Sequence, residues 1–360
     1  MRTRSLQPPT GSVNEPQDLA AVPSDGVTAG AIMVDVDKIE ALRKASAFPD
    51  LDCFDTISRR RETYLGPTME SNWVLPGKLL VGAYPASIDD DQHAHLLCGI
   101  LLEGVSTFVC LQQEYLAEGV TEDMWKSGKA IRPYYQDVLQ LLKKLQELRR
   151  KNPQVYPSII PPEKADFVHF PIVDCDVADD AKVLQLALQL SSRVASGEVM
   201  YLHCWGGHGR TGTVVSIMLH LMYGLGAKES MERCQFVHDV RRVPIDVGSP
   251  QTESQRQQVE RIIKHLAQHW PKLQEEAPPA PAQEAPRRNN PEVGAEAGAG
   301  ARGGAAGSTG QRKRPGRLRR RAMGSGELQG VASRAAPSLS RATMAAVGAP
   351  GGQPDMIVED

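Results

Sequence analysis

The sequence predicts an α/β domain whose sheet is largely covered by helices. Short apolar runs alternate along the chain with segments whose apolar residues recur at helical spacing. One of these runs leads directly into a glycine-rich loop and then into a helix. The patterned region also has the length of one ordinary domain. Strands that are interleaved with helices in this way pack as layers around one core.

The expected elements follow one another in a regular order. We expect strands at residues 78–81, 107–111, 167–172 and 199–203. A helix over residues 179–196 begins with acidic residues and ends at a glycine, as helices commonly do. Three further helices are predicted from apolar faces, formed first by Val138, Leu141, Leu142, Leu145 and Leu148, then by Val214, Ile217, Met218, Leu221 and Met222, and last by Val259, Ile262, Ile263 and Leu266.

Composition divides the 360 residues into three regions. Residues 1–65 form an N-terminal extension that we expect to be partly disordered. Residues 66–272 hold the periodic patterns and are the predicted domain. Residues 273–360 are rich in Ala, Gly, Pro and Arg and contain too little apolar surface to offset the entropy of ordering, so we expect a disordered tail.

Charge and cysteine content exclude several classes of protein. The 41 Lys and Arg residues nearly balance the 43 Asp and Glu residues, so no specific binding of nucleic acid is expected. Six cysteines without a Cys-x-x-Cys pair argue against a disulfide scaffold and a structural zinc site. Residues 1–30 lack the apolar core of a signal peptide, and the longest apolar stretch, 213–225, is too short for a membrane span. We expect a monomer in the cytoplasm, the nucleus or both.

Residues 199–215, VMYLHCWGGHGRTGTVV, carry the most chemical information. The N–H groups at the start of a helix that follows a glycine-rich loop form a binding site for anions. Cys204 opens this loop, and Arg210 can bind two phosphate oxygens at once through its planar guanidinium group. Such surroundings lower the pKa of thiols, so a thiolate is expected here. The segment therefore predicts a cysteine nucleophile that attacks phosphorus and forms a phosphocysteine.

The segment resembles the signature loop of the protein tyrosine phosphatase superfamily, in which His-Cys is followed by five residues and then by Arg-Ser/Thr. Three other stretches extend the resemblance over about residues 70–270. FPIVDCDVADD is similar to the acid loop of that family, SPQTESQ to its Gln loop, and SNWVLPGKLLVGAYP to the entry strand of the dual-specificity branch. The resemblance implies a dual-specificity-like fold, with a central mixed sheet flanked by helices, and a reaction that needs no metal or other cofactor.

The resemblance also implies roles for the residues of the loop. Cys204 corresponds to the nucleophile and Arg210 to the phosphate-binding arginine. His203 is expected to orient the loop and to help lower the pKa of the cysteine, and Thr211 to hydrogen-bond the thiolate as it departs. The phosphate-binding residues are then Trp205, Gly206, Gly207, His208, Gly209 and Arg210.

Two further residues correspond to catalytic groups outside this loop. Asp174 matches the general acid, because it is the first polar residue after the apolar strand; the other carboxylates nearby are Asp176, Asp179 and Asp180. Gln251 matches the glutamine that positions the hydrolytic water, and the alternative is a solvated residue at the cap of a helix.

Two residues of the loop depart from the commonest family patterns. His208 stands where many members have an apolar residue or a lysine, and it either adds positive charge near neutral pH or only fills the loop. Trp205 is expected to pack beneath or beside the loop, with stacking on substrate as the alternative. Lipid phosphatases of the superfamily often have lysine at both positions, so this loop argues against a highly charged inositide.

From these residues we expect an active phosphatase that acts on phosphotyrosine, and on phosphoserine and phosphothreonine, in a protein substrate. One alternative is a phosphatase of a small molecule or a phosphoinositide. A pseudophosphatase that only binds phosphorylated residues is the other, and the presence of Cys204, Arg210 and Asp174 argues against it.

The remaining candidates concern regulation and metal binding. The basic run at residues 312–321 is either a nuclear signal or a solvated block of charge. Cys110 with Tyr115 resembles the setting of a resolving cysteine in some relatives, and implies a reversible disulfide with Cys204. His93 and His95, beside residues 89–91, are expected on a solvated face rather than at a metal. The other cysteines are expected to be small apolar residues that are buried or partly buried: Cys53, Cys98, Cys175 and Cys234.

Overall fold

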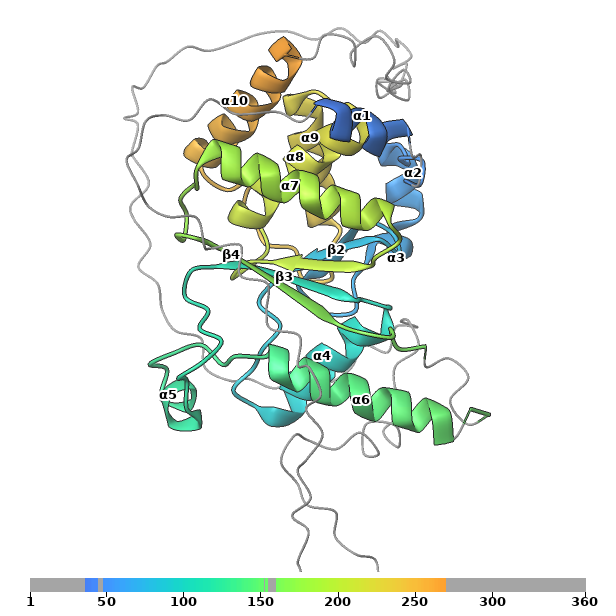
Figure 1. Ribbon diagram of the computed structural model, residues 1–360, viewed down its shortest axis with the longest axis vertical. Coiled ribbons are helices and arrows are strands. Elements are labelled where there is room, and N and C mark those ends of the chain that lie inside the picture. The colour runs from blue at the N-terminus through green and yellow to red at the C-terminus, as the bar shows by residue number, and fades with distance from the viewer. Residues whose placement is uncertain (1–35, 45–47, 152, 155–159, 270–360) are drawn as a thin grey trace, which may run out of the picture. The chain divides into compact units, whose positions relative to one another are not determined.

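A five-stranded mixed sheet forms the centre of the domain (Figure 1). The computed structural model describes residues 36–44, 48–151, 153–154 and 160–269. The strands are β1 (Ser71–Leu75), β2 (Leu79–Gly82), β3 (Thr107–Gln112), β4 (Asp166–Ile172) and β5 (Met200–His203), in the order β1-β2-β5-β3-β4. β1 is antiparallel to β2, and the other neighbouring strands are parallel. The expected mixed sheet is confirmed.

Helices cover both faces of this sheet (Figure 1). On one face lie α4 (Asp90–Leu102) and α6 (Tyr135–Lys151). On the other face lie α1 (Val36–Lys44), α7 (Asp180–Ala195), α8 (Gly209–Tyr223), α9 (Ala227–Asp239) and α10 (Glu253–His269). Helix α8 is buried over nearly its whole length, which explains why its sequence is apolar on all sides. The short helix α5 (Glu122–Lys126) lies between β3 and α6.

The pairing of the strands places the loop that follows β5 at the middle of the edge where the parallel strands end. β5 runs between β2 and β3 and is parallel to both, so its last residue, His203, lies opposite Gly82 and Cys110. In sheets of this kind ligands bind beyond the carboxyl ends of the strands. The loop that follows β5 is therefore held between two neighbouring strands, at the edge where a ligand is expected.

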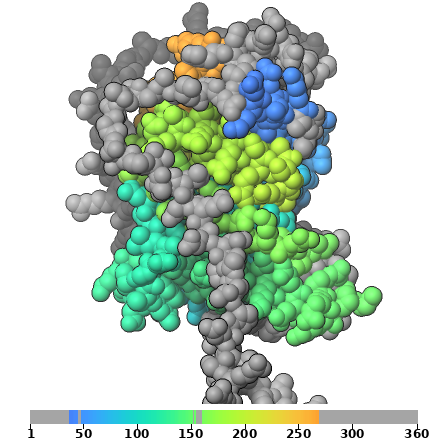
Figure 2. Space-filling model, in the orientation of Figure 1, coloured from blue at the N-terminus to red at the C-terminus, as the bar shows by residue number. Residues whose placement is uncertain are grey.

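The domain begins earlier than residue 66, the boundary that the sequence predicted. Helix α1 contacts α7 and α8 at the surface of the domain (Figures 1 and 2). Two shorter helices follow it, α2 (Phe54–Arg59) and α3 (Arg61–Tyr64). Ile39, Ile57 and Tyr64 are buried in the same core as the sheet. These helices were missed because each contains only one to four apolar residues, among many charged ones.

Helix α1 is also joined to the end of α8 by hydrogen bonds. Arg43 donates from Nε to the carbonyl of Leu221 at 2.9 Å and from Nη2 to that of His220 at 2.7 Å. These carbonyls belong to the last turn of α8, where helical N–H partners run out. The carbonyl of His220 also accepts from the N–H of Gly224, at 2.8 Å. The predicted disordered segments at 1–30 and 273–360, and the basic run at 312–321, lie outside the described residues.

Candidate active site

The signature segment runs from β5 into α8 through a loop of residues 204–208. Cys204 opens this loop and is 3% exposed, and Arg210 lies in the first turn of α8 and is 2% exposed. Gly207 has a φ of +72°, and its Cα lies against the carbonyl of Gly82 in β2. Any side chain there would strain the backbone and collide with that carbonyl. The structure thus brings Cys204 and Arg210 together at the N-terminus of a long helix, where anions bind.

His203 is buried below the loop and is neutral near pH 7. Burial lowers its pKa to about 3. The hydroxyl of Tyr134 donates to Nε2 at 2.6 Å, so Nδ1 carries the proton and donates to the carbonyl of Cys204 at 3.2 Å. This pair of bonds supports the expected role of His203 in orienting the loop. The expected help in lowering the pKa of the cysteine stays a prediction, and a neutral imidazole could contribute only through this hydrogen bond.

Arg210 is fixed from three directions by groups of neighbouring loops. Its Nη1 donates to the carbonyl of Ile172 at 3.0 Å and contacts Oε2 of Glu114 at 3.3 Å. Its Nη2 donates to Oδ1 of Asp174 at 2.8 Å. Among the described residues Nε has no hydrogen-bond partner, so the Nε–Nη2 edge of the guanidinium can turn toward a phosphate. Glu114 was not predicted from the sequence.

The contacts of Asp174 differ from those of the other three carboxylates of the acid loop. Asp174 is the one that contacts Arg210. Oδ1 of Asp176 instead accepts from the N–H of the next residue at 2.8 Å. Asp179 caps the N-terminus of α7, and Asp180 forms an ion pair with an arginine of α10. The dipole of α7 and these local contacts account for the latter three carboxylates.

Thr211 and Gln251 both lie close to the start of α8. The Oγ1 atom of Thr211 is buried and has no hydrogen-bond partner among the described residues. A buried hydroxyl without a partner is unusual, and it is available to a ligand or a thiolate in the loop. Gln251 is exposed, and its Cβ lies against Gly209. Its backbone N–H donates to the side chain of Gln255, which in turn donates to the carbonyl of Asp176 at 3.2 Å.

A second buried arginine, Arg241, supports the loop from behind. Its Nη1 and Nη2 donate to the carbonyls of Gly206 and Gly207, each at 2.9 Å. Its Nε donates to Oδ1 of Asn72 in β1 at 2.8 Å. Because Arg241 holds these carbonyls on its own side of the loop, the N–H groups of the loop can face a ligand on the other side. Sequence reasoning missed Arg241, because the pattern "VRRVP" in which it stands gives no sign of which arginine is buried.

Three apolar side chains are exposed on the loop or close in sequence to groups that contact Arg210, and we call them the apolar rim: Trp205, Val173 and Leu116. Trp205 is 60% exposed and its ring is stacked on that of Tyr84, with centroids 6.0 Å apart. It therefore packs beside the loop, one of the two positions expected. Val173, next to Asp174, and Leu116, close to Glu114 in sequence, are also exposed. Cys175 is exposed in the acid loop with a φ of 61°, so the expectation that it is buried or partly buried was wrong.

His208 does not add positive charge to the loop near neutral pH. Burial, with Arg241 and His238 nearby, lowers its pKa to about 4. Nδ1 of His238 donates to Asp239 at 3.0 Å, which leaves Nε2 of His238 to accept from Nδ1 of His208 at 3.0 Å. Of the two interpretations that the sequence left open, the filling of the loop agrees with these contacts.

Replacing His208 by glutamine is expected to weaken the acid dependence of stability. Between pH 6.5 and about 4 the unfolded chain binds a proton at this position and the folded chain does not. Stability is thus fully present above pH 6.5 and falls as the pH drops through this window, by at most about 1.4 kcal/mol per pH unit for one group. Urea unfolding at several pH values measures the slope. Equal slopes for the two proteins below pH 6.5 would contradict the prediction, and above pH 7.5 the slopes should agree.

Cys110 lies on β3 directly opposite His203, the residue before Cys204. Both thiols are free and buried. Burial raises the pKa of the Cys110 thiol well above its usual range, which makes it a slow nucleophile. The disulfide that the resemblance implied therefore stays a prediction, and we expect it to form slowly.

Mild peroxide tests this disulfide. Peroxide would oxidise Cys204 to a sulfenic acid, and the sulfur of Cys110 would then displace water to form the Cys110–Cys204 bond. Mass spectrometry should detect this cross-link, and the variant Cys110→Ala should lose activity to peroxide irreversibly. The prediction fails if no cross-link appears and sulfinic Cys204 accumulates in the unmodified protein.

In the part of the chain that the structure describes, no three His, Cys, Asp or Glu side chains are grouped to hold a metal ion. His93, expected on a solvated face, is instead buried, and its Nε2 is 2.9 Å from Oδ2 of Asp137. None of the described helices has the length and apolar character that crossing a bilayer requires.

Sequence comparison places this site in a known class. Residues 136–270 match the family described as "PTP-SAK: Swiss Army Knife protein, DSP-PTPase phosphatase domain". This segment includes Asp174, Cys204, Arg210 and Gln251. Residues 136–270 therefore match a domain of the cysteine-dependent protein tyrosine phosphatase superfamily, in its dual-specificity-like branch. Within that branch, the family that matches is the Swiss Army Knife phosphatase domain.

The individual proteins that match this chain are only distantly similar to it. The putative tyrosine phosphatase 067L of invertebrate iridescent virus 3 is 31% identical over 101 residues, which are 27% of this chain and 40% of the viral protein. The crystal structure of Tk-PTP in its active form is 18% identical, with a TM-score of 0.33, and the match covers 54% of this chain and 97% of that one. That of PTPMT1 in complex with PI(5)P is 17% identical, with a TM-score of 0.34, and the match covers 55% and 97%.

Proposed function

We propose that this domain hydrolyses phosphotyrosine in proteins, and phosphoserine and phosphothreonine as well, through a phosphocysteine intermediate. The observation that carries the proposal is the buried pair of Cys204 and Arg210 at the N-terminus of α8, with Asp174 in contact with that arginine. The signature segment then supplies the nucleophile and the phosphate-binding arginine, and the acid loop supplies the general acid.

In the first step Cys204 attacks phosphorus while its oxygens are bound by the loop N–H groups and by Arg210. The oxygens bind the Nε–Nη2 edge of the guanidinium and displace the carboxylate of Asp174 from Nη2. Asp174, protonated, gives its proton to the leaving oxygen of the alcohol. The sulfur–phosphorus bond forms as the phosphorus–oxygen bond breaks.

In the second step water attacks the phosphocysteine and releases inorganic phosphate. Asp174 now accepts a proton from this water, which Gln251 positions from its place beside Gly209. The partnerless hydroxyl of Thr211 donates to the departing thiolate. His203 and Arg241 do not touch the substrate; they are positioning residues that hold the backbone of the loop.

The charge of the loop supports a substrate with a single phosphate. Of the three basic side chains in residues 203–212, burial keeps His203 and His208 neutral near pH 7, so Arg210 is the one that is charged there. A polyphosphorylated inositol would need further cations to bind its additional phosphates. The exposed apolar rim of Trp205, Val173 and Leu116 suits the side chains of a peptide.

One panel of substrates tests the proposal. The full chain is assayed with phosphotyrosine, phosphoserine and phosphothreonine peptides, with phosphoinositides in vesicles, with sugar phosphates and with an aryl phosphate. We expect the phosphotyrosine peptides to have the highest kcat/KM among the natural classes. Higher kcat/KM on phosphoinositides or sugar phosphates would reject a protein substrate. Binding of phosphopeptides without any turnover, of the aryl phosphate included, would reject the enzyme altogether.

A further inference from the structure

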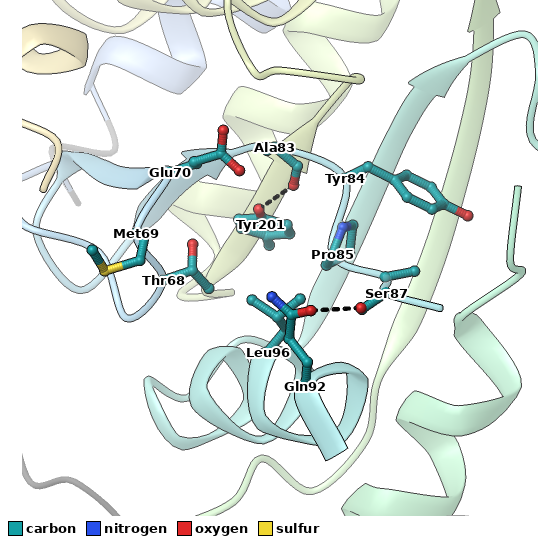
Figure 3. A pocket seen from close by; sticks show the side chains of 11 residues that line it. Thr68, Met69, Glu70, Ala83, Tyr84, Pro85, Ser87, Gln92, Leu96 and Tyr201 are labelled. Carbon is teal, nitrogen blue, oxygen red and sulfur yellow. Dashed lines mark hydrogen bonds between the residues drawn. The ribbon is translucent and has the colours of Figure 1, made fainter. Parts of the chain in front are cut away.

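A cavity of about 250 Å³ lies beside the segment 83–87 that follows β2 (Figure 3). Its other walls come from residues 68–70 before β1, from α4 and from Tyr201 of β5. Thr68, Glu70, Ser87, Gln92 and Tyr201 give it polar groups. The catalytic scheme above uses none of these side chains.

This cavity shares a wall with the candidate active site. Tyr84 lines it, and the N–H of Tyr84 donates to the carbonyl of Trp205 at 2.9 Å. In Figure 3 the ring of Tyr84 points away from Glu70 and Tyr201, and this ring stacks on that of Trp205. The neighbouring residue, Ala83, accepts a hydrogen bond from Tyr201 inside the cavity. An extended peptide advances about 3.3 Å per residue, so a substrate bound at the loop brings its nearby side chains to this wall.

The lining has an apolar part and one carboxylate, that of Glu70, whose charge also acts on the guanidinium of Arg241. Met69, Pro85 and Leu96 supply the apolar surface. Glu70 is exposed and forms no ion pair within the described residues, and none of the side chains that line the cavity is basic. A phosphate or a carboxylate would be repelled by Glu70, and a purely apolar group would leave this carboxylate without a partner.

Lysine and arginine side chains would suit both the apolar surface and the carboxylate of Glu70. Their aliphatic stems pack on apolar surface while the charged head stays at a polar, solvated position. Here the stem would lie along Met69 and Leu96, and the head would reach the carboxylate of Glu70.

We propose that this cavity is a specificity subsite that binds a basic side chain within three residues of the phosphorylated residue of a protein substrate. The inference rests on the proposed function, since it presumes a peptide in the active site. It adds a selection rule, which is a preference for phosphorylation sites flanked by arginine or lysine. The part of the substrate that reacts is bound elsewhere, by the signature loop.

Phosphotyrosine peptides that carry Arg, Ala or Glu at each of the three positions on either side test this subsite. For the full chain we expect one position at which kcat/KM ranks Arg above Ala above Glu, with a two- to fivefold step for an exposed charge pair. The step should shrink as salt is raised. In Glu70→Gln the ratio of Arg to Ala should fall to about one, and in Glu70→Lys the order should reverse.

The matched control is Glu260→Gln, which removes a negative charge from the exposed face of α10 and should keep the preference. Peptides hydrolysed without any basic preference would overturn the subsite and leave the proposed function intact. So would a preference that persists in Glu70→Gln and Glu70→Lys. If the aryl phosphate is hydrolysed and no phosphopeptide is, it is the proposed function that has failed.

Discussion

Cys204→Ser is expected to bind phosphate esters and to lose nearly all turnover. A serine hydroxyl does not ionise near neutral pH, and the structure offers it no base: His203, its neighbour, already donates its only proton to the backbone and accepts from Tyr134. Loss of a nucleophile costs on the order of 10⁴–10⁶ in kcat. Stopped assays with the aryl phosphate give the rate, and calorimetry with a phosphopeptide gives the affinity.

A second cysteine variant, Cys53→Ser, is the control that distinguishes loss of the nucleophile from a general effect on folding. Cys53 stands at the N-cap of α2, where serine is a favoured residue, so Cys53→Ser should keep the activity of the natural sequence. If purified Cys204→Ser turned substrate over at a substantial rate, the phosphocysteine mechanism would have to be abandoned.

Asp174→Ala should lower kcat for phosphopeptides by about 10²–10⁴-fold, the usual value of a general acid. An aryl phosphate with a good leaving group needs less protonation and should suffer less. The structure adds a second expectation. Asp174 occupies Nη2 of Arg210, so removing the carboxylate frees this donor for phosphate, and KM should stay the same or fall. A merely structural aspartate would not separate kcat from KM in this way.

The control for this experiment is Asp176→Ala. Its carboxylate bonds to the N–H of Val177 within the same loop, so its loss should change kcat much less. The pH–rate profile gives an independent reading, because the basic limb should flatten in Asp174→Ala only. If the two variants exchange their behaviour, the acid has been assigned to the wrong residue.

The parts of the fold that the sequence predicted are those with a local pattern. The strand and loop around Cys204 were found because apolar runs, glycines and the Cys-x5-Arg spacing are continuous in the chain. The same holds for the amphipathic face of α6 and for the acidic start of α7. These patterns predicted a buried strand, a glycine-rich loop and a helix around Cys204, and the structure has β5 and α8 on either side of that loop.

The parts that were missed depend on contacts between distant residues. Arg241 reaches the loop from 34 or 35 positions away in the sequence, and Tyr134 reaches His203 from 69. Burial also depends on contacts between distant residues. The pKa of His208 is lowered to about 4 because other segments of the chain pack around its side chain. A side chain's partner and its solvation are properties of the folded chain, so residue type alone predicts neither.

The bonds from Arg43 to the end of α8 determine where the chain can be shortened. A protein trimmed to the boundary at residue 66 would lose Ile39 and Leu42 from the core, at about 1.5–3 kcal/mol for each buried side chain. It would also leave the carbonyls of Leu221 and His220 without their guanidinium. Against a total of about 5–15 kcal/mol for a typical domain, such a fragment would be marginally folded at best. Recombinant fragments of this protein should therefore start upstream of α1, and weak activity in a shorter one would reflect a partly unfolded domain rather than a poor catalyst.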